Sequence, residues 1–550
     1  MRGIGWLLVA LAGGACQAAA PPAVRRSAPP PAPAARRSST EDRAAVVVVA
    51  VFDQLGSDTL AALAPHLNEN GAIQLARREG AWHARVRYAH AVTDTAPGHA
   101  AIATGRPARD TGIAANASWS EARQRVVPVM DGGRHAVLGV PDKFASPLGL
   151  RARTVADALH ERTAGAAKIV SLSLKDRSAI LLGGRHADLV AWYEPSLPGF
   201  TTSTYYPPLP GWWQSWHKGH PPERLLVPWH PLLPADTLGR ILGPDAAPGE
   251  GRWLGWDTEL PHDPAASSAP YDVVRLAPAL SERLLALAAT SAEQEQLGVD
   301  ATPDLLSISI SGTDFVGHIF GPHSWEYFDH LYRADLALGA LLRELAERRR
   351  VSAVLTSDHG VSPLVERVGG ERLYPAELVA AAEAALDVEL GAGDWVRRFV
   401  KPFLYLSPEA KQPKQREQAL RAATGALAAL DGVRLAVSTE VARGWISARD
   451  PIQRAAALSV PQAWPGDVIV LPAPDHVFDE GLAPDAGTSH GSPWPHDSDV
   501  PALLWGAGVE RAATSEPLDQ ARVAASVAAL LRIPWSDEPL PGVTQPDDQR

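Results

Sequence analysis

The sequence has 550 residues, with 51 Lys and Arg against 62 Asp and Glu, and its net charge of −11 argues against simple non-specific binding to nucleic acid. Hydrophobic residues make up 46% of the chain, which is enough for a large core and excludes a wholly disordered protein. The single cysteine excludes an intramolecular disulfide and a Cys-rich zinc module, so a metal site must use carboxylates and some of the 18 histidines.

The first 41 residues have the composition of an export segment. Residues 4–12 are apolar but too short to cross a bilayer, and small residues lead from there into Cys16. Residues 1–16 are therefore predicted to be a signal peptide, similar to a bacterial lipoprotein signal with a lipid on Cys16; cleavage near residues 18–20 is the alternative. Residues 17–41, rich in Pro and Ala, predict an extended tether. We expect an exported protein, periplasmic, secreted or held at the outer membrane, with Cys16 as its only membrane contact.

From residue 42 to residue 550, buried-strand patterns alternate with helical patterns, which predicts one α/β domain. The predicted strands are residues 44–52, 168–174, 304–310, 351–356 and 500–505. The predicted helices are residues 154–162, 325–349, 376–386, 414–430 and 521–531. Because the strands are apolar on both faces, they favour a doubly wound, mostly parallel sheet flanked by helices. Inserted cap segments are predicted at about residues 197–270, which are rich in Pro and aromatic residues, and at about residues 395–485.

Polar side chains follow four of the predicted strands. They are Asp53, Lys175, Arg177, Asp314, His318, Asp358 and His359. In a doubly wound sheet, ligands bind at the edge formed by the carboxyl ends of the strands, so these side chains are expected to converge. Asp314 and His318, four residues apart, would share one face of a helix. With His490 in the Gly- and Ser-rich loop 487–492, the two Asp/His pairs and Asp53 suit two zinc ions.

Thr95 lies before a helix start that contains Pro97, and the helix is expected over residues 97–103. A hydroxyl at this place is close to unpaired backbone N–H groups and to the positive end of the helix, which favour phosphate and an alkoxide. Coordination to zinc would lower the pKa of the hydroxyl and make it a nucleophile. Taken alone, Thr95 is more typical of a helix cap, and an Asp after a strand is more typical of a turn. The convergence of several such residues at one edge favours a functional site.

In this order, the segments resemble the alkaline phosphatase superfamily. They are most similar to the branch that holds the nucleotide pyrophosphatase/phosphodiesterases and the zinc-only bacterial alkaline phosphatases with a threonine nucleophile. The matching segments are residues 51–54 (VFDQ), 93–99 (TDTAPGH), 112–116 (GIAAN), 175–177 (KDR), 312–318 (GTDFVGH), 356–360 (TSDHG) and 487–492 (GTSHGS). They span nearly the whole chain after the tether, and the resemblance makes residues 42–550 an alkaline phosphatase-like catalytic domain.

The resemblance implies two zinc ions and a role for each polar residue. One zinc would be held by Asp314, His318 and His490, and the second by Asp53, Asp358 and His359, with Thr95 completing its shell. Asn116 would donate a hydrogen bond to a phosphoryl oxygen, and Lys175 and Arg177 match the basic pair of the monoesterase-type members. His496 is close enough in sequence to compete with His490, but we interpret it as structural or surface, together with His99, His186 and His323.

The predicted function is hydrolysis of small-molecule phosphate monoesters by an exported, zinc-dependent enzyme that acts through a phosphothreonine intermediate. The alternative within the superfamily is a phosphodiesterase or nucleotide pyrophosphatase, which has less use for two fixed cations beside the metals. A cysteine-type sulfatase is excluded because Cys16 lies in the predicted signal, and a phosphomutase usually has serine at the nucleophile position. A non-catalytic exported binding protein is the alternative from a different class. We expect no nucleic-acid-binding module.

Overall fold

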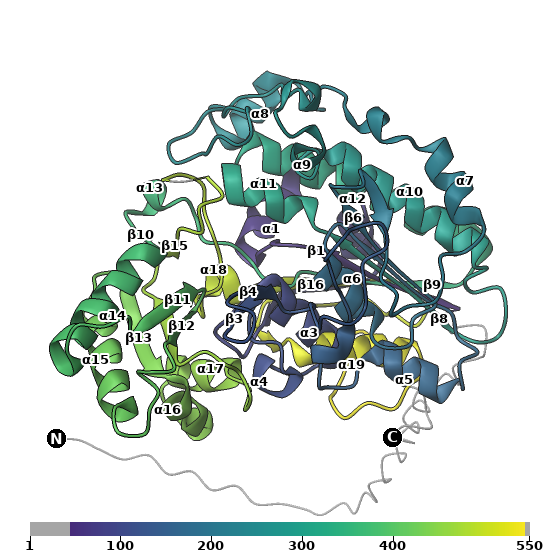
Figure 1. Cartoon of the computed structure of the whole chain (residues 1–550). Helices are drawn as coiled ribbons and strands as arrows, with labels where there is room; N and C mark the ends of the chain where they lie inside the picture. Colours follow the sequence, from purple (N-terminus) through teal and green to yellow (C-terminus); the bar gives the residue numbers. More distant parts are fainter. Residues whose placement is uncertain (1–44, 484, 545–550) are drawn as a thin grey trace, which may run out of the picture. The chain divides into compact units, whose positions relative to one another are not determined.

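The computed structural model describes residues 45–483 and 485–544 (Figure 1). The predicted signal peptide at residues 1–16, including Cys16, and the predicted tether at residues 17–41 lie outside the described residues. Within the described part, no helix combines the length and the apolar character needed to cross a membrane.

A ten-stranded sheet forms the centre of the described chain (Figure 1). Its parallel part consists, in spatial order, of β9 (Val351–Thr356), β1 (Val46–Phe52), β8 (Asp304–Ile310), β5 (Ile169–Ser173) and β6 (Leu189–Glu194). β16 (Asp499–Gly506) runs antiparallel between β9 and β2 (Ala81–Arg87), and the short strands β7 (Gly199–Thr201), β17 (Ala512–Thr514) and β18 (Leu518–Asp519) complete the sheet. The predicted α/β fold with a mostly parallel sheet is confirmed, although the run at residues 500–505 forms an antiparallel strand.

Helices cover both faces of the sheet because the central strands are apolar on both sides. In β1, Val46 and Val48 point into one core, and Val47 and Val49 point into the other. The first core includes residues of α1 (Ser57–Leu63), α2 (Ala72–Glu79), α10 (Pro278–Gln294), α11 (Gly312–Phe320) and α12 (Trp325–Arg348). The second core includes residues of α3 (Thr95–Thr104), α5 (Val155–Arg162), α6 (Asp176–Gly183) and α19 (Ala521–Leu530).

The predicted helices at residues 154–162, 325–349 and 521–531 correspond to α5, α12 and α19, with ends that differ by no more than one residue. α5 begins where its sequence indicates because Thr154 and Asp157 form a capping box. The Thr154 hydroxyl accepts a hydrogen bond from the Asp157 N–H (2.9 Å), and the Asp157 carboxylate accepts one from the Thr154 N–H (3.2 Å). This pairing satisfies backbone donors that a helix start would otherwise leave without partners.

The predicted insertion at residues 197–270 contains α7 (Trp212–Gly219), α8 (Ala235–Leu242) and the first residue of α9 (Pro270–Val273). Its large aromatic residues Trp213, Trp216, Trp229 and Trp256 are buried in the first core. The aromatic composition that marked this segment in the sequence therefore serves to attach it to the helices below.

The second predicted insertion, residues 395–485, contains a separate antiparallel sheet. Its strands, in spatial order, are β11 (Val396–Val400), β12 (Phe403–Leu406), β14 (Val468–Pro472) and β13 (Val433–Ser438). One face packs on α14 (Pro375–Leu390) and α15 (Arg416–Ala428), which correspond to the predicted helices at residues 376–386 and 414–430, and the other on α16 (Thr439–Arg443) and α17 (Pro451–Ser459). The shorter described elements are β3 (Ala117–Ser120), β4 (Arg125–Pro128), β10 (Arg372–Leu373), β15 (Val477–Phe478), α4 (Ala108–Thr111), α13 (Val365–Val368) and α18 (Pro495–Ser498).

Helix α3 lies so close to the chain after β9 that only glycine fits at one position. A Cβ atom on Gly98 would lie 2.2 Å from the backbone oxygen of Asp358. Because the obstacle is backbone rather than the end of a flexible side chain, a larger residue would push the two segments apart. The separation of Thr95 on α3 from Asp358 after β9 therefore depends on this contact.

We predict that Gly98→Ala lowers the free energy of unfolding by about 1–3 kcal/mol, because it overpacks this contact. The matched control is Gly425→Ala in the last turn of α15, where a Cβ atom meets nothing within 4 Å. That variant should gain roughly 0.5–1 kcal/mol, because alanine favours a helix interior more than glycine does. Chemical denaturation of both variants measures the difference, and equal shifts of the same sign would contradict the close approach of α3.

Candidate functional site

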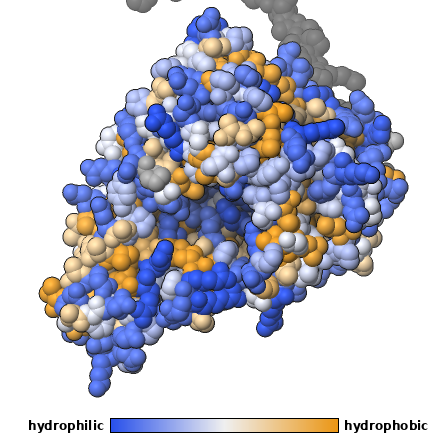
Figure 2. All heavy atoms as spheres, turned by 45° about the horizontal axis from the view of Figure 1, so that its top comes forward, coloured by the Kyte–Doolittle hydropathy of each residue, from blue (hydrophilic) through white to orange (hydrophobic). Residues whose placement is uncertain are grey.

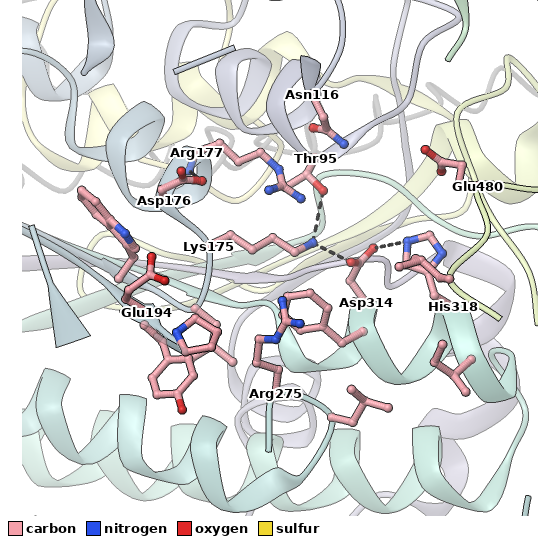
Figure 3. A pocket seen from close by; sticks show the side chains of 18 of the residues that line it. Thr95, Asn116, Lys175, Asp176, Arg177, Glu194, Arg275, Asp314, His318 and Glu480 are labelled. Atoms are coloured by element: carbon pink, nitrogen blue, oxygen red, sulfur yellow. Dashed lines mark hydrogen bonds and ion pairs between the residues drawn. The ribbon is translucent and has the colours of Figure 1, made fainter. Parts of the chain in front are cut away.

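A cavity of about 420 Å³ opens at the carboxyl ends of the parallel strands. Figure 2 shows one face of the molecule hollowed near its centre, where the surface is hydrophilic. The cavity is lined by seven of the residues that the sequence singled out: Thr95, Asn116, Lys175, Arg177, Asp314 and His318, which Figure 3 labels, and His490. They come from α3, the loop after α4, the start of α6, α11 and the loop before β16.

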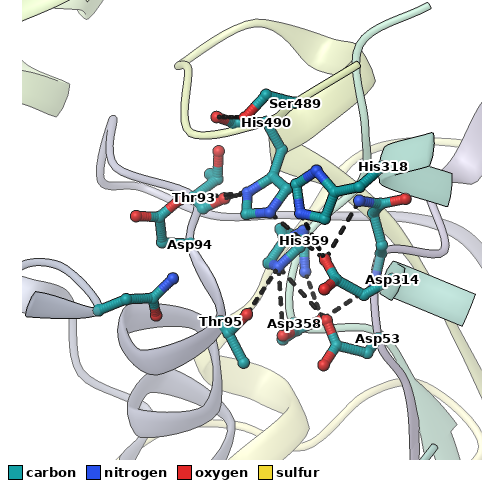
Figure 4. Close-up of polar contacts among 12 residues, drawn as sticks. Asp53, Thr93, Asp94, Thr95, Asp314, His318, Asp358, His359, Ser489 and His490 are labelled. Atoms are coloured by element: carbon teal, nitrogen blue, oxygen red, sulfur yellow. Dashed lines mark hydrogen bonds and ion pairs between the residues drawn. The ribbon is translucent and has the colours of Figure 1, made fainter. Parts of the chain in front are cut away.

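Beside this cavity, three imidazoles and three carboxylates form one buried cluster (Figure 4). Ligand atoms of Asp314, His318 and His490 lie within 4.8 Å of one another, and so do those of Asp53, Asp314 and His359. Asp358 adjoins the second group, since its Oδ2 lies 3.4 Å from His359 Nε2. The structure thus brings together both predicted ligand sets, with Asp314 between them.

The two Asp/His pairs converge in different ways. Asp314 and His318 are one helical turn apart on α11, and His318 Nε2 lies 3.3 Å from Asp314 Oδ1, as the spacing of four predicts. Asp358 and His359 are neighbours in the turn after β9, where the chain has left the strand and both side chains can face the cluster. His490 Nε2 lies 3.4 Å from Asp314 Oδ1.

His490, rather than His496, is the histidine that reaches the cluster. His496 is in α18, and its side chain lies 3.8 Å from Asp497, while its backbone oxygen accepts a hydrogen bond from Val361 N (2.9 Å). The interpretation of His496 as structural therefore agrees with its position. His99 is also buried, and its Nδ1 lies 3.1 Å from Asp358 Oδ2, so it contacts the cluster through Asp358.

Thr95 is the first residue of α3, so the helix begins two residues earlier than predicted. Asp94 is the N-cap residue of α3, so Thr95 lies inside the helix and its interpretation as a helix cap does not hold. Thr95 Oγ1 instead lies 3.2 Å from Lys175 Nζ and 3.5 Å from His359 Nε2 (Figures 3 and 4). The hydroxyl therefore stands between the histidine and carboxylate cluster and the cavity.

Three nitrogen-bearing side chains line the cavity together with Thr95. Asn116 accepts a hydrogen bond from Ala96 N–H through Oδ1 (2.8 Å), and its NH2 group has no acceptor within the described ranges, so it can donate to a ligand. Lys175 Nζ donates to Asp53 (2.8 Å) and Asp314 (2.6 Å). Among the described residues, the Arg177 side chain has no hydrogen-bond or ion-pair partner, and its Nε is buried. Its charge is therefore available to an anion in the cavity.

Burial and mutual repulsion govern the charges in the cluster. Burial, reinforced by the charge of Asp358, raises the pKa of Asp53 well above its usual value. Burial lowers the pKa of His359 to about 3, so its ring stays neutral with a lone pair available to a cation. Burial and Lys401 lower the pKa of His490, but hydrogen bonds to Asp314 and Asp94 outweigh both and raise it to about 10. The acids around His490 thus favour a cation at this position.

Several residues that contact the cluster or line the cavity were given no role from the sequence. Gln54 has a left-handed backbone (φ 72°), which lets its N–H donate to Asp358 Oδ1 (3.2 Å) while its side chain donates to Asp314 Oδ1 (3.1 Å). Its place directly after Asp53 was the available hint. Lys401, Glu480 and Arg275 line the cavity but stand in irregular segments, where no periodic pattern indicates which way they point.

Lys401 connects the small antiparallel sheet to the cluster. It is buried in the turn between β11 and β12, forms an ion pair with Glu480 and lies 3.2 Å from Asp94 Oδ1. Its Nζ also donates to the backbone oxygen of His490 (3.2 Å). Asp94 in turn lies 3.2 Å from His490 Nδ1, so Lys401 holds both the loop and the carboxylate that orient His490.

The fold is that of the alkaline phosphatase superfamily. The crystal structure of the alkaline phosphatase PafA superposes on the chain with a TM-score of 0.82 at 24% sequence identity, covering 92% of this chain and 99% of PafA. The model of the type I phosphodiesterase / nucleotide pyrophosphatase family matches residues 47–492. The chain therefore belongs to that family, as the sequence motifs indicated.

Two alkaline phosphatases are similar to this chain in sequence over most of its length. The alkaline phosphatase PhoV of Synechococcus elongatus is 28% identical over 499 residues, covering 88% of this chain and 89% of PhoV. The alkaline phosphatase PhoK of a Sphingomonas species is 28% identical over 519 residues, covering 89% of each chain. The likeness extends over nearly the whole length of all three proteins.

We predict that Lys401→Met lowers the free energy of unfolding by roughly 3–5 kcal/mol, because Asp94 and Glu480 lose their buried counter-charge. The matched control is Lys168→Met, whose partner Asp188 is 3.7 Å away and whose side chain is 47% exposed. That change should lose no more than about 1 kcal/mol. Adding Glu480→Gln to Lys401→Met should restore part of the loss. Denaturant unfolding of the four proteins tests the network, and equal losses at Lys401 and Lys168 would contradict it.

Proposed function

We propose that the protein hydrolyses phosphate monoesters and that Thr95 is its nucleophile. The observation that carries the proposal is the partially buried guanidinium of Arg177, which has no partner in the described part of the chain and lines the cavity together with Lys175, Asn116 and Thr95. A monoester has one more charged oxygen than a diester, and fixed cations stabilise that extra charge. The names of PhoV, PhoK and PafA as alkaline phosphatases support the same activity.

The residues beside Thr95 fit two divalent cations. Asp53 Oδ1 is buried without a hydrogen-bond partner among the described residues, and three imidazoles share the same small volume. Asp314, His318 and His490 would hold one ion, and Asp53, Asp358 and His359 would hold the other, together with Thr95. Nitrogen with carboxylate ligands suits zinc, which is the ion that we propose. When bound, the ions supply a lowered hydroxyl pKa and positive charge for the oxygens of the displacement.

The chain's own residues would then position the ester. Thr95 lies at the N-terminus of α3, where backbone N–H groups favour the negative charge of a phosphoryl group. Asn116, with its orientation fixed by Ala96, would donate to one non-bridging oxygen, and Arg177 would bind another in its fork-shaped geometry. Attack by the Thr95 oxygen on phosphorus expels the alcohol and leaves a phosphothreonine, which water then hydrolyses. Catalysis of this kind depends mainly on positioning and charge stabilisation.

A phosphodiesterase is the second candidate, because the chain belongs to a family described as type I phosphodiesterase / nucleotide pyrophosphatase. A diester has a neutral second ester group in place of the charged oxygen, so it would leave one of the two cations without a partner. A non-catalytic binding protein is the less favoured alternative, because each residue expected for turnover is present in the cluster or the cavity. We also propose export, through the predicted signal at residues 1–16, and keep lipidation of Cys16 as the finer proposal.

We predict that Arg177→Met lowers kcat/KM for an aryl phosphate by about 10²–10³-fold, the usual loss for one donor to a developing charge. The loss for a bis-aryl phosphate should be under about tenfold, because the diester does not place a charged oxygen at Arg177. Arg153→Met, at an exposed pair with Glu161, is the control and should change neither rate. A strong preference of the unaltered protein for the diester, or equal losses for both esters in Arg177→Met, would defeat the monoesterase proposal.

Thr95→Ala should abolish turnover while metal content stays at about two ions per chain, because the other proposed ligands remain. Thr95→Ser should keep measurable activity, because it retains the hydroxyl. Elemental analysis of the purified proteins measures the metal, and acid quenching with radiolabelled substrate measures the phosphoenzyme. Turnover by Thr95→Ala within tenfold of the unaltered protein would exclude the threonine as nucleophile. Full activity of the metal-free protein in the presence of chelator would exclude a role for metal ions in turnover.

A further inference from the structure

Besides Thr95, Asn116, Lys175 and Arg177, the cavity has lining residues to which no phosphoryl contact is assigned, and these residues form the cavity wall. The wall includes Trp253, Phe315 and Arg275. Arg275 stands in the short connection between α9 and α10, far in sequence from the motif residues. In Figure 3 the guanidinium groups of Arg177 and Arg275 approach the cavity from opposite sides of Lys175.

Arg275 is held in place by aromatic rings. Its Cζ lies 4.7 Å from the centroid of the Phe315 ring and 5.7 Å from that of Trp253. Lys175 Nζ lies 5.1 Å from the centroid of the same Phe315 ring, so both cations contact this one ring. Stacking on aromatic faces fixes a guanidinium at a small loss of side-chain entropy, because its planar fork is already rigid.

The hydrogen bonds of Arg275 leave one side of the fork open. Nε donates to the backbone oxygen of Asp272 (3.1 Å), and Nη2 donates to its carboxylate (2.9 Å). Nη1 has no acceptor among the described residues. The partner carboxylate is 43% exposed, so solvent screens much of its charge. Burial lowers the pKa of Arg275, as expected for a cation that water does not fully hydrate.

In the described part of the chain, the three lysines that line the cavity have close acidic partners, unlike Arg177. Lys143 pairs with Glu194 (2.5 Å), and Lys401 pairs with Asp94 and Glu480. Lys175 pairs with Asp53 and Asp314. Arg177 is the cation assigned above to the phosphoryl group. Among the described residues, Arg275 is therefore the remaining Lys or Arg of the cavity lining with an open donor, and no phosphoryl contact is assigned to it.

We propose that Arg275 binds an anionic group on the alcohol part of the phosphate monoester, so that the enzyme prefers monoesters whose alcohol carries a carboxylate or a second phosphate. The ligand group is an oxyanion, either a carboxylate or a second phosphate. This inference rests on the proposed monoesterase function and adds the class of leaving group to it. A preorganised guanidinium in a partly desolvated wall binds such a group more strongly than an exposed arginine does.

Two probes that differ only in this group test the proposal. 3-Phosphoglycerate has a carboxylate where glycerol 3-phosphate has a hydroxymethyl group. Relative to the unaltered protein, Arg275→Met should lower kcat/KM for 3-phosphoglycerate about tenfold or more, the value of a hydrogen bond to a charged group. The value for glycerol 3-phosphate should change less than about threefold. Because each probe is compared with itself, differences in leaving-group reactivity cancel.

Arg283→Met is the matched control, since Arg283 donates to the backbone oxygens of His220 and Pro221 and does not line the cavity. It should leave the ratio between the two probes unchanged. Circular dichroism and thermal unfolding check that Arg275→Met is folded, and Arg275→Gln supplies a second, polar variant. Raised salt should weaken the preference of the unaltered protein for 3-phosphoglycerate, because the contact is electrostatic.

A binding measurement separates this proposal from the proposed function. Calorimetry with metal-loaded Thr95→Ala should give tighter binding of 3-phosphoglycerate than of glycerol 3-phosphate, and Arg275→Met in that background should remove the difference. Equal binding of both probes, or equal losses for both in Arg275→Met, would overturn the role of Arg275 even if both are hydrolysed. Failure of the unaltered protein to hydrolyse either probe, with the binding difference intact, would overturn the monoesterase proposal alone.

Discussion

Three buried carboxylates in one small volume are the constraint on which the site depends. Asp53, Asp314 and Asp358 are removed from water, and their charges repel one another more strongly there than they would at the surface. Such a group of acids persists in a folded protein only when cations compensate it. Lys175 contacts two of the three, and His99 contacts the third. The same demand for positive charge makes the cluster suitable for divalent cations, and it explains why the fold holds three imidazoles beside it.

The register of the sheet brings these acids together. β1 lies between β8 and β9, with Phe52 opposite Ile310 and Val51 opposite Thr356. Asp53, Asp314 and Asp358 follow these strand ends within a few residues, so neighbouring strands about 4.8 Å apart deliver all three to one edge. α3 then approaches the same edge through Gly98, which brings Thr95 beside His359. The chemistry of the site is thus a consequence of which strands are neighbours.

The sequence was informative where local pattern determines structure. Runs such as residues 46–52 are apolar on both faces, so they predict a strand that is covered on both sides. An acid that directly follows such a run is then placed at the end of the strand. The direction of the strand at residues 500–505 could not be predicted from the sequence, because an apolar run is compatible with either direction. The path of the preceding loop decides the direction. Arg275 and Lys401 were missed for a related reason: their roles depend on how irregular segments pass the cavity, and no periodicity records that path.

The inner end and the wall of the cavity have different structural origins, and this division bears on selectivity. Residues that face the phosphoryl group stand at strand ends and helix starts, where the register of the sheet fixes their positions. Trp253 and Arg275 come from the aromatic insertion and its continuation into α10, whereas Lys401 and Glu480 come from the segment that carries the small sheet. A change in these segments can alter the wall without replacing the residues at the strand ends. The aromatic segment packs in the first core, and the small sheet packs on the rest of the domain through a separate apolar cluster. Preference among alcohols is therefore expected to be a property of the inserted segments, while the demand for a phosphoryl dianion remains a property of the sheet.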